Sequence, residues 1–154
     1  MRSTPVRVAD VVPFSWVDGP GNRYVVFLQG CPFDCIACHN PETIPPHRPD
    51  TRHTDVDEVL EEIRAVEPYL EGVTVSGGEP LAQPRFLVAL LEACRARGLH
   101  AALDTAGCGR WDVALCPDCR SLLTGEPIAV EHADAAGDLD VSALAVYAGP
   151  VRPM

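Results

Sequence analysis

The stretch RYVVFLQGCPFDCIAC, Arg23–Cys38, joins a strand-like segment to a loop rich in cysteine. Residues 23–29 are β-branched and aromatic over a short run, which predicts a strand. Three cysteines follow at once, Cys31, Cys35 and Cys38, with the spacing C-x3-C-x2-C. We therefore expect a strand that delivers a metal-binding loop at its carboxyl end.

Strands and helices alternate after this loop. Thr54 with Asp57 resembles a capping box, and the apolar residues that follow recur at helical spacing. The sequence predicts a helix over residues 55–70, a strand at 72–76, a tight turn at 77–80, a helix over 84–97 that ends at Gly98, and a strand over 99–105. The rest of the first third is rich in loop residues, and the signals beyond residue 108 are weak.

This alternation predicts an α/β fold with a parallel sheet and right-handed crossovers. In such folds, chemistry gathers in the loops that follow the strands. Cys31 and Gly77 follow predicted strands, and Asp104 lies at the end of another. We therefore expect the three motifs to share one rim of the sheet.

Composition limits the classes of function. The chain has 154 residues, enough for one domain, and its formal charge is −10, with arginine as the only cationic residue type. This acidic balance argues against nucleic-acid binding. No apolar run approaches the length of a membrane span and the N-terminus lacks a signal-like segment, so we expect a cytoplasmic protein without a membrane partner. Seven cysteines in a reducing compartment indicate metal ligands or reactive thiols.

The cysteine loop suits more than one metal, because thiolates bind both iron–sulfur clusters and zinc. Three cysteines on a [4Fe-4S] cluster leave one iron without a protein ligand, where a substrate can bind. In the zinc alternative His39 is the fourth ligand, but the spacing matches the usual paired zinc pattern poorly. A chance group of free thiols is the third alternative.

Longer segments carry a resemblance to a known family. VDGPGNRYVVFLQGCPFDCIACHNPET, GVTVSGGEP and LDTAG resemble motifs of the radical S-adenosylmethionine (SAM) enzymes, and within them of the glycyl-radical-enzyme activating enzymes. The resemblance spans residues 17–107. It implies that Cys31, Cys35 and Cys38 bind a [4Fe-4S] cluster, with the amino and carboxylate groups of SAM on the fourth iron.

The resemblance also assigns residues to SAM. Gly77, Gly78 and Glu79 would hold the methionine amino group; independently, two glycines let a ligand approach the backbone, and a carboxylate accepts from an ammonium. An ordinary strand-to-helix turn is the alternative. Asp104 and Thr105 match a position that coordinates a monovalent cation beside SAM, although Asp104 could instead cap the following turn.

Three residues of the cysteine loop complete this expected site. By resemblance, His39 and Asn40 pack near the cluster and contact the adenosine of SAM. Ala37 stands where the family usually carries an aromatic residue beside the adenine, so backbone contacts would hold the base there.

The chain departs from the family in its last third. It contains no lysine, so the family's Asp-x-Lys motif is absent, and it is too short for six βα units. The resemblance therefore implies an incomplete TIM-type (β/α) barrel, with a radical SAM core at residues 1–107 and a shortened part of the same domain at 108–154. In length it resembles the compact activating proteins of anaerobic ribonucleotide reductase.

Four cysteines lie outside the loop. Cys94 falls at helical spacing with leucines and is expected to be a small buried hydrophobic residue. Cys108, Cys116 and Cys119 either hold zinc or a second cluster, with assistance from His132, or are free thiols.

The resemblance implies an enzyme. A reduced cluster would pass one electron to SAM, giving methionine and a 5′-deoxyadenosyl radical, which would take a hydrogen atom from a glycine of a partner enzyme. Flavodoxin or ferredoxin would donate the electron. Two alternatives stay open: radical SAM chemistry on a small molecule or peptide, and an iron–sulfur electron carrier or zinc-binding interaction module.

Overall fold

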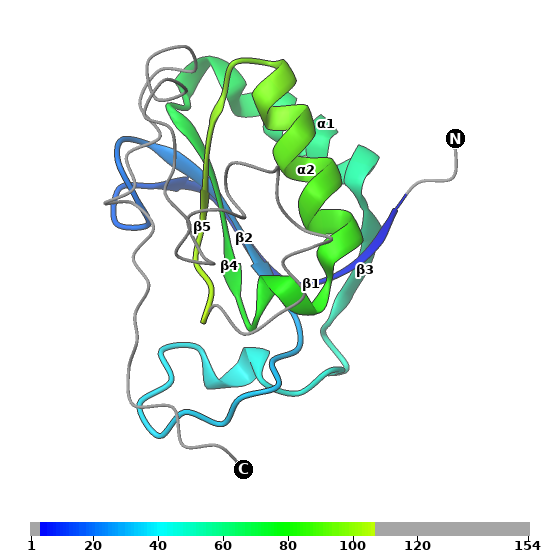
Figure 1. The fold of residues 1–154 in the computed structure, drawn as a ribbon. Coiled ribbons are helices and arrows are strands. Elements are labelled where there is room, and N and C mark those ends of the chain that lie inside the picture. The colour runs from blue at the N-terminus through cyan, green and yellow to red at the C-terminus, as the bar shows by residue number, and fades with distance from the viewer. Residues whose placement is uncertain (1–3, 107–154) are drawn as a thin grey trace, which may run out of the picture.

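The computed structural model describes residues 4–106, which form one sheet with two α-helices (Figure 1). The elements are β1 (Pro5–Ser15), β2 (Arg23–Leu28), β3 (Arg52–Asp55), α1 (Val56–Val66), β4 (Gly72–Gly77), α2 (Pro84–Ala96) and β5 (His100–Leu103). Three short 3-10 helices lie between them: η1 (Pro41–Thr43), η2 (Glu67–Tyr69) and η3 (Pro80–Ala82). The proposed second metal site at Cys108, Cys116 and Cys119, and the weak elements beyond residue 108, lie outside the described residues.

The sheet is mixed, which corrects the expectation of a parallel sheet. Its strand order is β3-β1-β2-β4-β5. β2, β4 and β5 run parallel, as the alternation of elements predicts. β1 runs antiparallel to both of its neighbours, β2 and β3. The sequence therefore predicts the parallel half of the sheet correctly and misses the antiparallel half.

Both missed strands depend on pairing with partners that are distant in the sequence. β1 has register shifts between Val8 and Asp10 and between Val12 and Ser15, which interrupt its alternation of inward and outward residues. β3 has four residues, of which Thr54 is the buried one. Its strand conformation follows from its pairing with residues 5–8 of β1, which local sequence does not reveal.

The hydrophobic core lies between the sheet and the helices. Figure 1 shows α1 and α2 on the same side of the sheet. Alternate residues of β4, Val73 and Val75, are fully buried in this core, so Thr74 and Ser76 face the other side. The core members are Val6, Val8, Tyr24, Val26, Leu28, Val56, Val59, Ile63, Val73, Val75, Leu81, Phe86, Leu87, Leu90, Cys94 and Leu103.

Helix α1 begins one residue later than the predicted capping box. Asp55 is the N-cap, and its carboxylate accepts from the backbone N–H groups of Asp57 and Glu58, each at 3.0 Å. Thr54 is not the cap, because its hydroxyl donates to the carboxylate of Glu58 and the N–H groups of the first turn bind Asp55 instead. The regular helix ends at Val66, and Pro68 lies in η2.

Helix α2 ends as predicted. Gly98 adopts a left-handed φ of +72°, and the N–H of Leu99 donates to the carbonyl of Cys94 at 3.0 Å, which closes the last turn. Cys94 is 0% exposed, which confirms the prediction of a buried thiol.

The buried Cys94 thiol predicts how stability depends on pH. Burial raises its pKa from 9.0 to about 11, whereas a thiol in an unfolded chain ionises near ~8.5. Between the two values the unfolded chain releases a proton that the folded protein keeps, so stability falls as pH rises. We expect a loss of about 3 kcal/mol across this window of two or more pKa units, because one pKa unit corresponds to ~1.4 kcal/mol.

Urea unfolding on both sides of this window measures the effect, with Cys94→Ala as the comparison. The variant should be less stable at every pH because it leaves a cavity, but its stability should fall less steeply with pH. Burial also raises the pKa of Tyr24, so Tyr24 lowers stability at high pH in both proteins and does not account for a difference between their pH slopes. Equal pH slopes in the two proteins would show that Cys94 does not titrate in this way.

Candidate cofactor site

The carboxyl ends of β2, β4 and β5 bring the three sequence motifs together. These strands are neighbours in the sheet, so the segments that follow them meet at one rim. The N–H of Gly78 donates to the carbonyl of Leu28 at 2.8 Å, and the N–H of Glu79 donates to the carbonyl of Gly30 at 2.9 Å. The N–H of Asp104 donates to the carbonyl of Val75 at 2.9 Å. The expectation of a shared rim is confirmed.

The cysteine loop projects from this rim. Cys31 and Cys38 are half-buried, Cys35 is exposed, and the N–H of Cys38 donates to the carbonyl of Cys35 at 3.1 Å. Two backbone hydrogen bonds close the loop at its base: Gly30 N–H to Thr43 O at 2.8 Å, and Cys31 N–H to Ile44 O at 3.0 Å. Among residues 4–106, no three His, Cys, Asp or Glu side chains are grouped so that they could hold a metal ion.

The pKa of the Cys31 thiol is raised by its surroundings. Burial raises the pKa of its thiol, a backbone hydrogen bond from Phe33 lowers it, and the nearby Glu79, Cys35 and Cys38 raise it further. The raised pKa favours the neutral thiol of Cys31 in the absence of a metal, and a bound metal would stabilise its thiolate form. Sulfur is the donor that iron–sulfur clusters take, so the residue type at these three positions suits a cluster. The structure does not group the three side chains around a common point, and their assignment as ligands stays a prediction.

The Gly-Gly turn packs against backbone. Gly77 has a left-handed φ of +112°, and a Cβ there would lie 2.2 Å from the backbone nitrogen of Leu28. A Cβ on Gly78 would lie 2.2 Å from the carbonyl oxygen of Gly30. The sequence interpretation explained these glycines by the close approach of a ligand, whereas the structure shows the close approach of the segment that leads into the cysteine loop.

The Glu79 side chain connects two parts of the rim. It is 2% exposed. Its carboxylate accepts from Leu81 N–H at 2.9 Å, Thr105 Oγ1 at 2.6 Å and Ala106 N–H at 2.8 Å. Glu79 thus ties the turn after β4 to the segment after β5. Its assignment to the amino group of SAM stays a prediction.

Asp104 lies on the side of the sheet that faces away from the helices. Burial raises the pKa of its carboxyl, a hydrogen bond from Ser76 lowers it, Asp18 raises it and Arg23 lowers it. The hydroxyl of its neighbour Thr105 is engaged by Glu79. Thr105 thus contacts the Gly-Gly-Glu turn, and the role of the two residues at a monovalent cation stays a prediction.

The remaining expected residues lie in the exposed part of the cysteine loop. Ala37 and His39 are exposed, and Asn40 is half-buried. The carbonyl of Asn40 accepts from the N–H of Thr43 at 3.0 Å and from its hydroxyl at 2.7 Å, which begins η1. Asn40 therefore has a structural role in the loop, and contacts of these residues with the cluster or adenosine stay predictions.

Sequence reasoning missed two glutamines at the base of the loop. Gln29 is 1% exposed and follows β2 directly, while Gln83 precedes α2. The available signal for Gln29 was its place, since a polar residue between an apolar strand and a glycine has to find a hydrogen-bond partner once it is buried.

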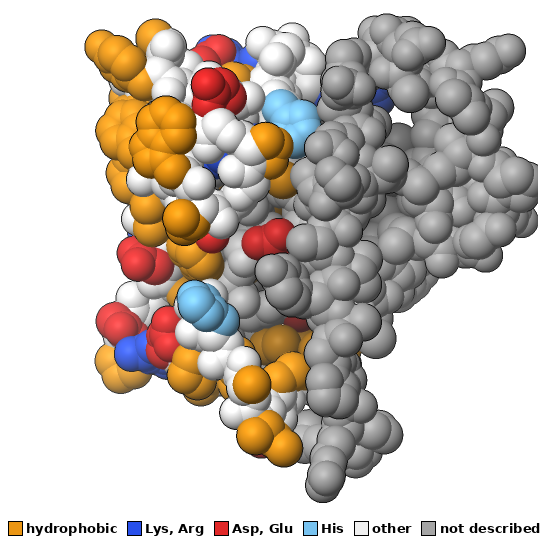
Figure 2. All heavy atoms as spheres, turned by 90° about the vertical axis from the view of Figure 1, so that its left-hand side faces the viewer, with side chains coloured by type: hydrophobic (Ala, Val, Ile, Leu, Met, Phe, Trp, Pro, Cys, Tyr) orange, Lys and Arg blue, Asp and Glu red, His pale blue; other side chains and the backbone are white. Residues whose placement is uncertain are grey.

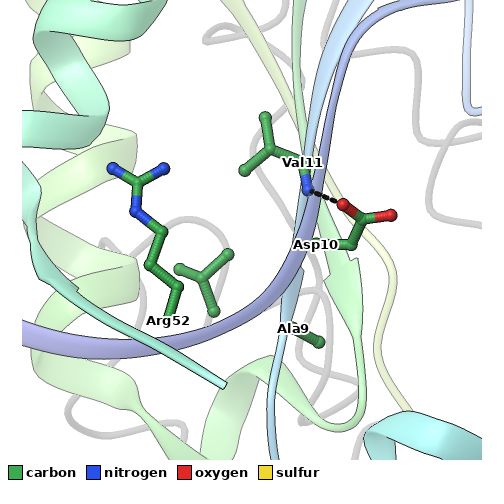
Figure 3. Close-up of a pocket in the computed structure, with 5 residues that line it drawn as sticks. Ala9, Asp10, Val11 and Arg52 are labelled. Atoms are coloured by element: carbon green, nitrogen blue, oxygen red, sulfur yellow. Dashed lines mark hydrogen bonds between the residues drawn. The ribbon is translucent and has the colours of Figure 1, made fainter. Parts of the chain in front are cut away.

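Two other features include none of the rim motifs. A hollow of about 230 Å³ between β1 and β3 is lined by Val8, Ala9, Asp10, Val11 and Arg52 (Figure 3), none of which is a predicted site residue. At the opposite end of the sheet, Phe14, Trp16 and Val17 are exposed. The ring of Phe14 packs edge to face against the ring of Tyr69, with 6.4 Å between the ring centroids. Figure 2 shows hydrophobic side chains gathered at the upper left of its view.

Comparison with protein families finds one match that covers more than half of the chain. Residues 17–111 match a family described as "4Fe-4S single cluster domain". The matched range contains the cysteine loop, the Gly-Gly-Glu turn and the segment after β5. None of the helices in the described residues is long and apolar enough to cross a membrane.

Curated relatives are similar over the same region. A Haemophilus influenzae protein named as a glycyl-radical enzyme activating enzyme is 43% identical over 102 residues, which cover 66% of this chain and 39% of that protein. The pyruvate formate-lyase-activating enzyme of Staphylococcus epidermidis is 50% identical over 97 residues, which cover 60% of this chain and 38% of that enzyme. The chain thus spans about two-fifths of the length of these curated relatives.

The fold also resembles a solved structure. The crystal structure of QueE from Escherichia coli superposes with a TM-score of 0.56 at 17% sequence identity, covering 68% of this chain and 54% of that chain. At this identity the likeness concerns the fold alone, and it supports a barrel-like α/β architecture. That the barrel is incomplete stays a prediction.

Proposed function

Because the chain belongs to the 4Fe-4S single cluster domain family, among the radical SAM proteins related to glycyl-radical-enzyme activating enzymes, we propose that it cleaves SAM reductively at a [4Fe-4S] cluster. Cys31, Cys35 and Cys38 would bind this cluster. When bound, the cluster supplies the electron that converts SAM to methionine and a 5′-deoxyadenosyl radical.

The observation that carries this proposal is the joining of three motifs at one rim. The Gly-Gly-Glu turn donates backbone hydrogen bonds to Leu28 and Gly30, directly before the first cysteine. The carboxylate of Glu79 then binds Thr105 and Ala106. A SAM molecule at the cluster would therefore lie beside residues 77–79 and 104–105, which the resemblance assigns to its amino group and to a cation beside its carboxylate.

We infer that the substrate is a glycine in the backbone of a large partner enzyme. Two facts support this: a curated relative is named as a glycyl-radical enzyme activating enzyme, and the tip of the cysteine loop is exposed. Cys35 is exposed, and the adjacent Ile36 is 92% exposed. A small redox protein such as flavodoxin or ferredoxin would donate its electron to a cluster on this loop.

Anaerobic reconstitution of the full chain with iron and sulfide tests the proposal. Adding dithionite and SAM should yield 5′-deoxyadenosine and methionine in equal amounts, measured by chromatography, whereas omission of dithionite should yield neither. A protein that carries the cluster but forms no 5′-deoxyadenosine under these conditions would contradict the enzymatic proposal.

The partner is tested separately by electron paramagnetic resonance. With a glycyl-radical enzyme from the same organism, the reaction should produce a carbon-centred radical on the partner, and replacement of the partner's acceptor glycine by alanine should remove it. Formation of 5′-deoxyadenosine without any radical on the partner would favour a small molecule or peptide as the substrate.

A further inference from the structure

At the base of the cysteine loop, a buried side-chain amide bridges the segment that enters the loop and the segment that leaves it. The Nε2 of Gln29 donates to the carbonyl of Glu42 at 3.0 Å and to the carbonyl of Pro45 at 2.6 Å. Gln29 lies on the segment that enters the loop, and Glu42 and Pro45 lie on the segment that leaves it. We call residues 29–31 together with residues 42–45 the neck of the loop.

Backbone hydrogen bonds run alongside this amide. Gly30 N–H donates to Thr43 O and Cys31 N–H donates to Ile44 O, at 2.8 and 3.0 Å. The two carbonyls that Gln29 binds flank these acceptors in the sequence. The side chain thus binds the same short segment that sets the position of Cys31, and it supplies two hydrogen bonds that no backbone group of the entering chain provides.

The amide group of Gln83 fixes the other side of the neck. Its Nε2 donates to the carbonyls of Arg7 at 2.9 Å and Gln29 at 3.2 Å, and its Oε1 accepts from the N–H of Arg7 at 2.8 Å. The N–H of Gln29 donates to the carbonyl of Arg7 at 2.9 Å. The main chain of Gln29 is therefore held to β1 and to the start of α2, so its side chain extends from a rigid base.

We propose that Gln29 is a positioning residue for the cluster ligand Cys31. This inference rests on the proposed function, in which Cys31, Cys35 and Cys38 bind one cluster. Cys31 lies in the neck, whereas the other two cysteines lie farther out in the loop, so the neck sets the position of Cys31 relative to them. Loss of the Gln29 amide leaves two carbonyls in the neck without this donor and frees the departing segment to move.

A matched pair of substitutions tests the proposal in the full chain without a cluster. Gln29→Met keeps the length of the side chain and removes both donors. Asn22→Leu is the control, because Asn22 is also a buried amide whose Nδ2 binds one carbonyl, that of Tyr69 at 2.7 Å, but it precedes β2 at the opposite end of the sheet. We expect amide hydrogen exchange at Gly30 and Cys31 to be about tenfold faster in Gln29→Met than in the native chain or in Asn22→Leu.

A second variant keeps the test decisive if Gln29→Met fails to fold. Gln29→Glu has the native shape, but an ionised carboxylate cannot donate to the two carbonyls, whereas a protonated carboxyl group donates to one. Protection of Gly30 and Cys31 should therefore be lost at high pH and partly restored at low pH, relative to amides of α2. Unchanged protection at high pH, or equal losses in Asn22→Leu, would overturn the proposal.

The cluster provides a further readout. After reconstitution, the variants at residue 29 should show an altered paramagnetic resonance spectrum and midpoint potential of the reduced cluster, while Asn22→Leu should match the native protein. Faster exchange at the neck with an unaltered spectrum and potential would show that Gln29 orders the loop without positioning Cys31. Failure of the proposed function is distinct, because it appears as absence of 5′-deoxyadenosine with the native chain.

Discussion

Cys35→Ala should abolish the visible absorption of the iron–sulfur cluster and most of the bound iron. Cys35 is the exposed cysteine of the three, and two remaining thiolates are not enough to retain a [4Fe-4S] cluster on this loop. The other cysteine in residues 4–106 is Cys94, which is buried in α2 and cannot replace it. Iron analysis and the absorption spectrum after anaerobic reconstitution measure the loss.

Folding should survive this substitution. An exposed loop side chain usually contributes within about 0.5 kcal/mol to stability, so the urea midpoint of the cluster-free variant should equal that of the native chain. Cys94→Ala is the control for loss of a thiol: it should lower stability and keep the cluster. The comparison is cleanest in a background without Cys108, Cys116 and Cys119, which could hold iron of their own. A normal spectrum and iron content in Cys35→Ala would disprove the ligand assignment.

The local sequence was sufficient to predict those strands and helices whose structure depends on the residues within the segment itself. The β-branched runs of β2 and β4 and the helical spacing in α1 and α2 are local signals, and Gly98 marks the end of α2 because it adopts a left-handed conformation there. Since parallel neighbours end on the same side, the rim followed from the order of these elements. β1 and β3 were missed because their pairing, with residues 5–8 opposite 52–55, is a long-range property.

The sequence was sufficient to propose which residues form the candidate site, but not which contacts each of them makes. The spacing of the three cysteines predicts a metal-binding loop without a structure. Nothing local to Glu79 reveals that its carboxylate binds Thr105 and Ala106, twenty-six and twenty-seven positions away. Gln29 was overlooked for the same reason, because its partners Glu42 and Pro45 lie beyond the loop that it closes.

Gly78→Ala should destabilise the cluster-free protein by about 3 kcal/mol or more, because overpacking against atoms that cannot move is costly. The added Cβ would lie 2.2 Å from the carbonyl oxygen of Gly30, 2.7 Å from its carbonyl carbon and 2.9 Å from the carbonyl oxygen of Thr43. All three are backbone atoms, and a backbone hydrogen bond joins Gly30 to Thr43 in the neck. Urea unfolding of the full chain, without iron or SAM, measures the loss.

Gly98→Ala is the matched control, since a Cβ on Gly98 meets nothing within 4 Å and the cost is confined to its φ of +72°. That cost is about 1 kcal/mol, the usual penalty for a left-handed residue with a side chain. The contrast separates the two explanations of the Gly-Gly turn. If Gly78→Ala keeps native stability and weakens only the binding of SAM to the reconstituted protein, the glycine serves ligand approach. If the cluster-free chain already loses far more stability than Gly98→Ala, the glycine is required by the backbone that leads into the cysteine loop, and this is the result we expect.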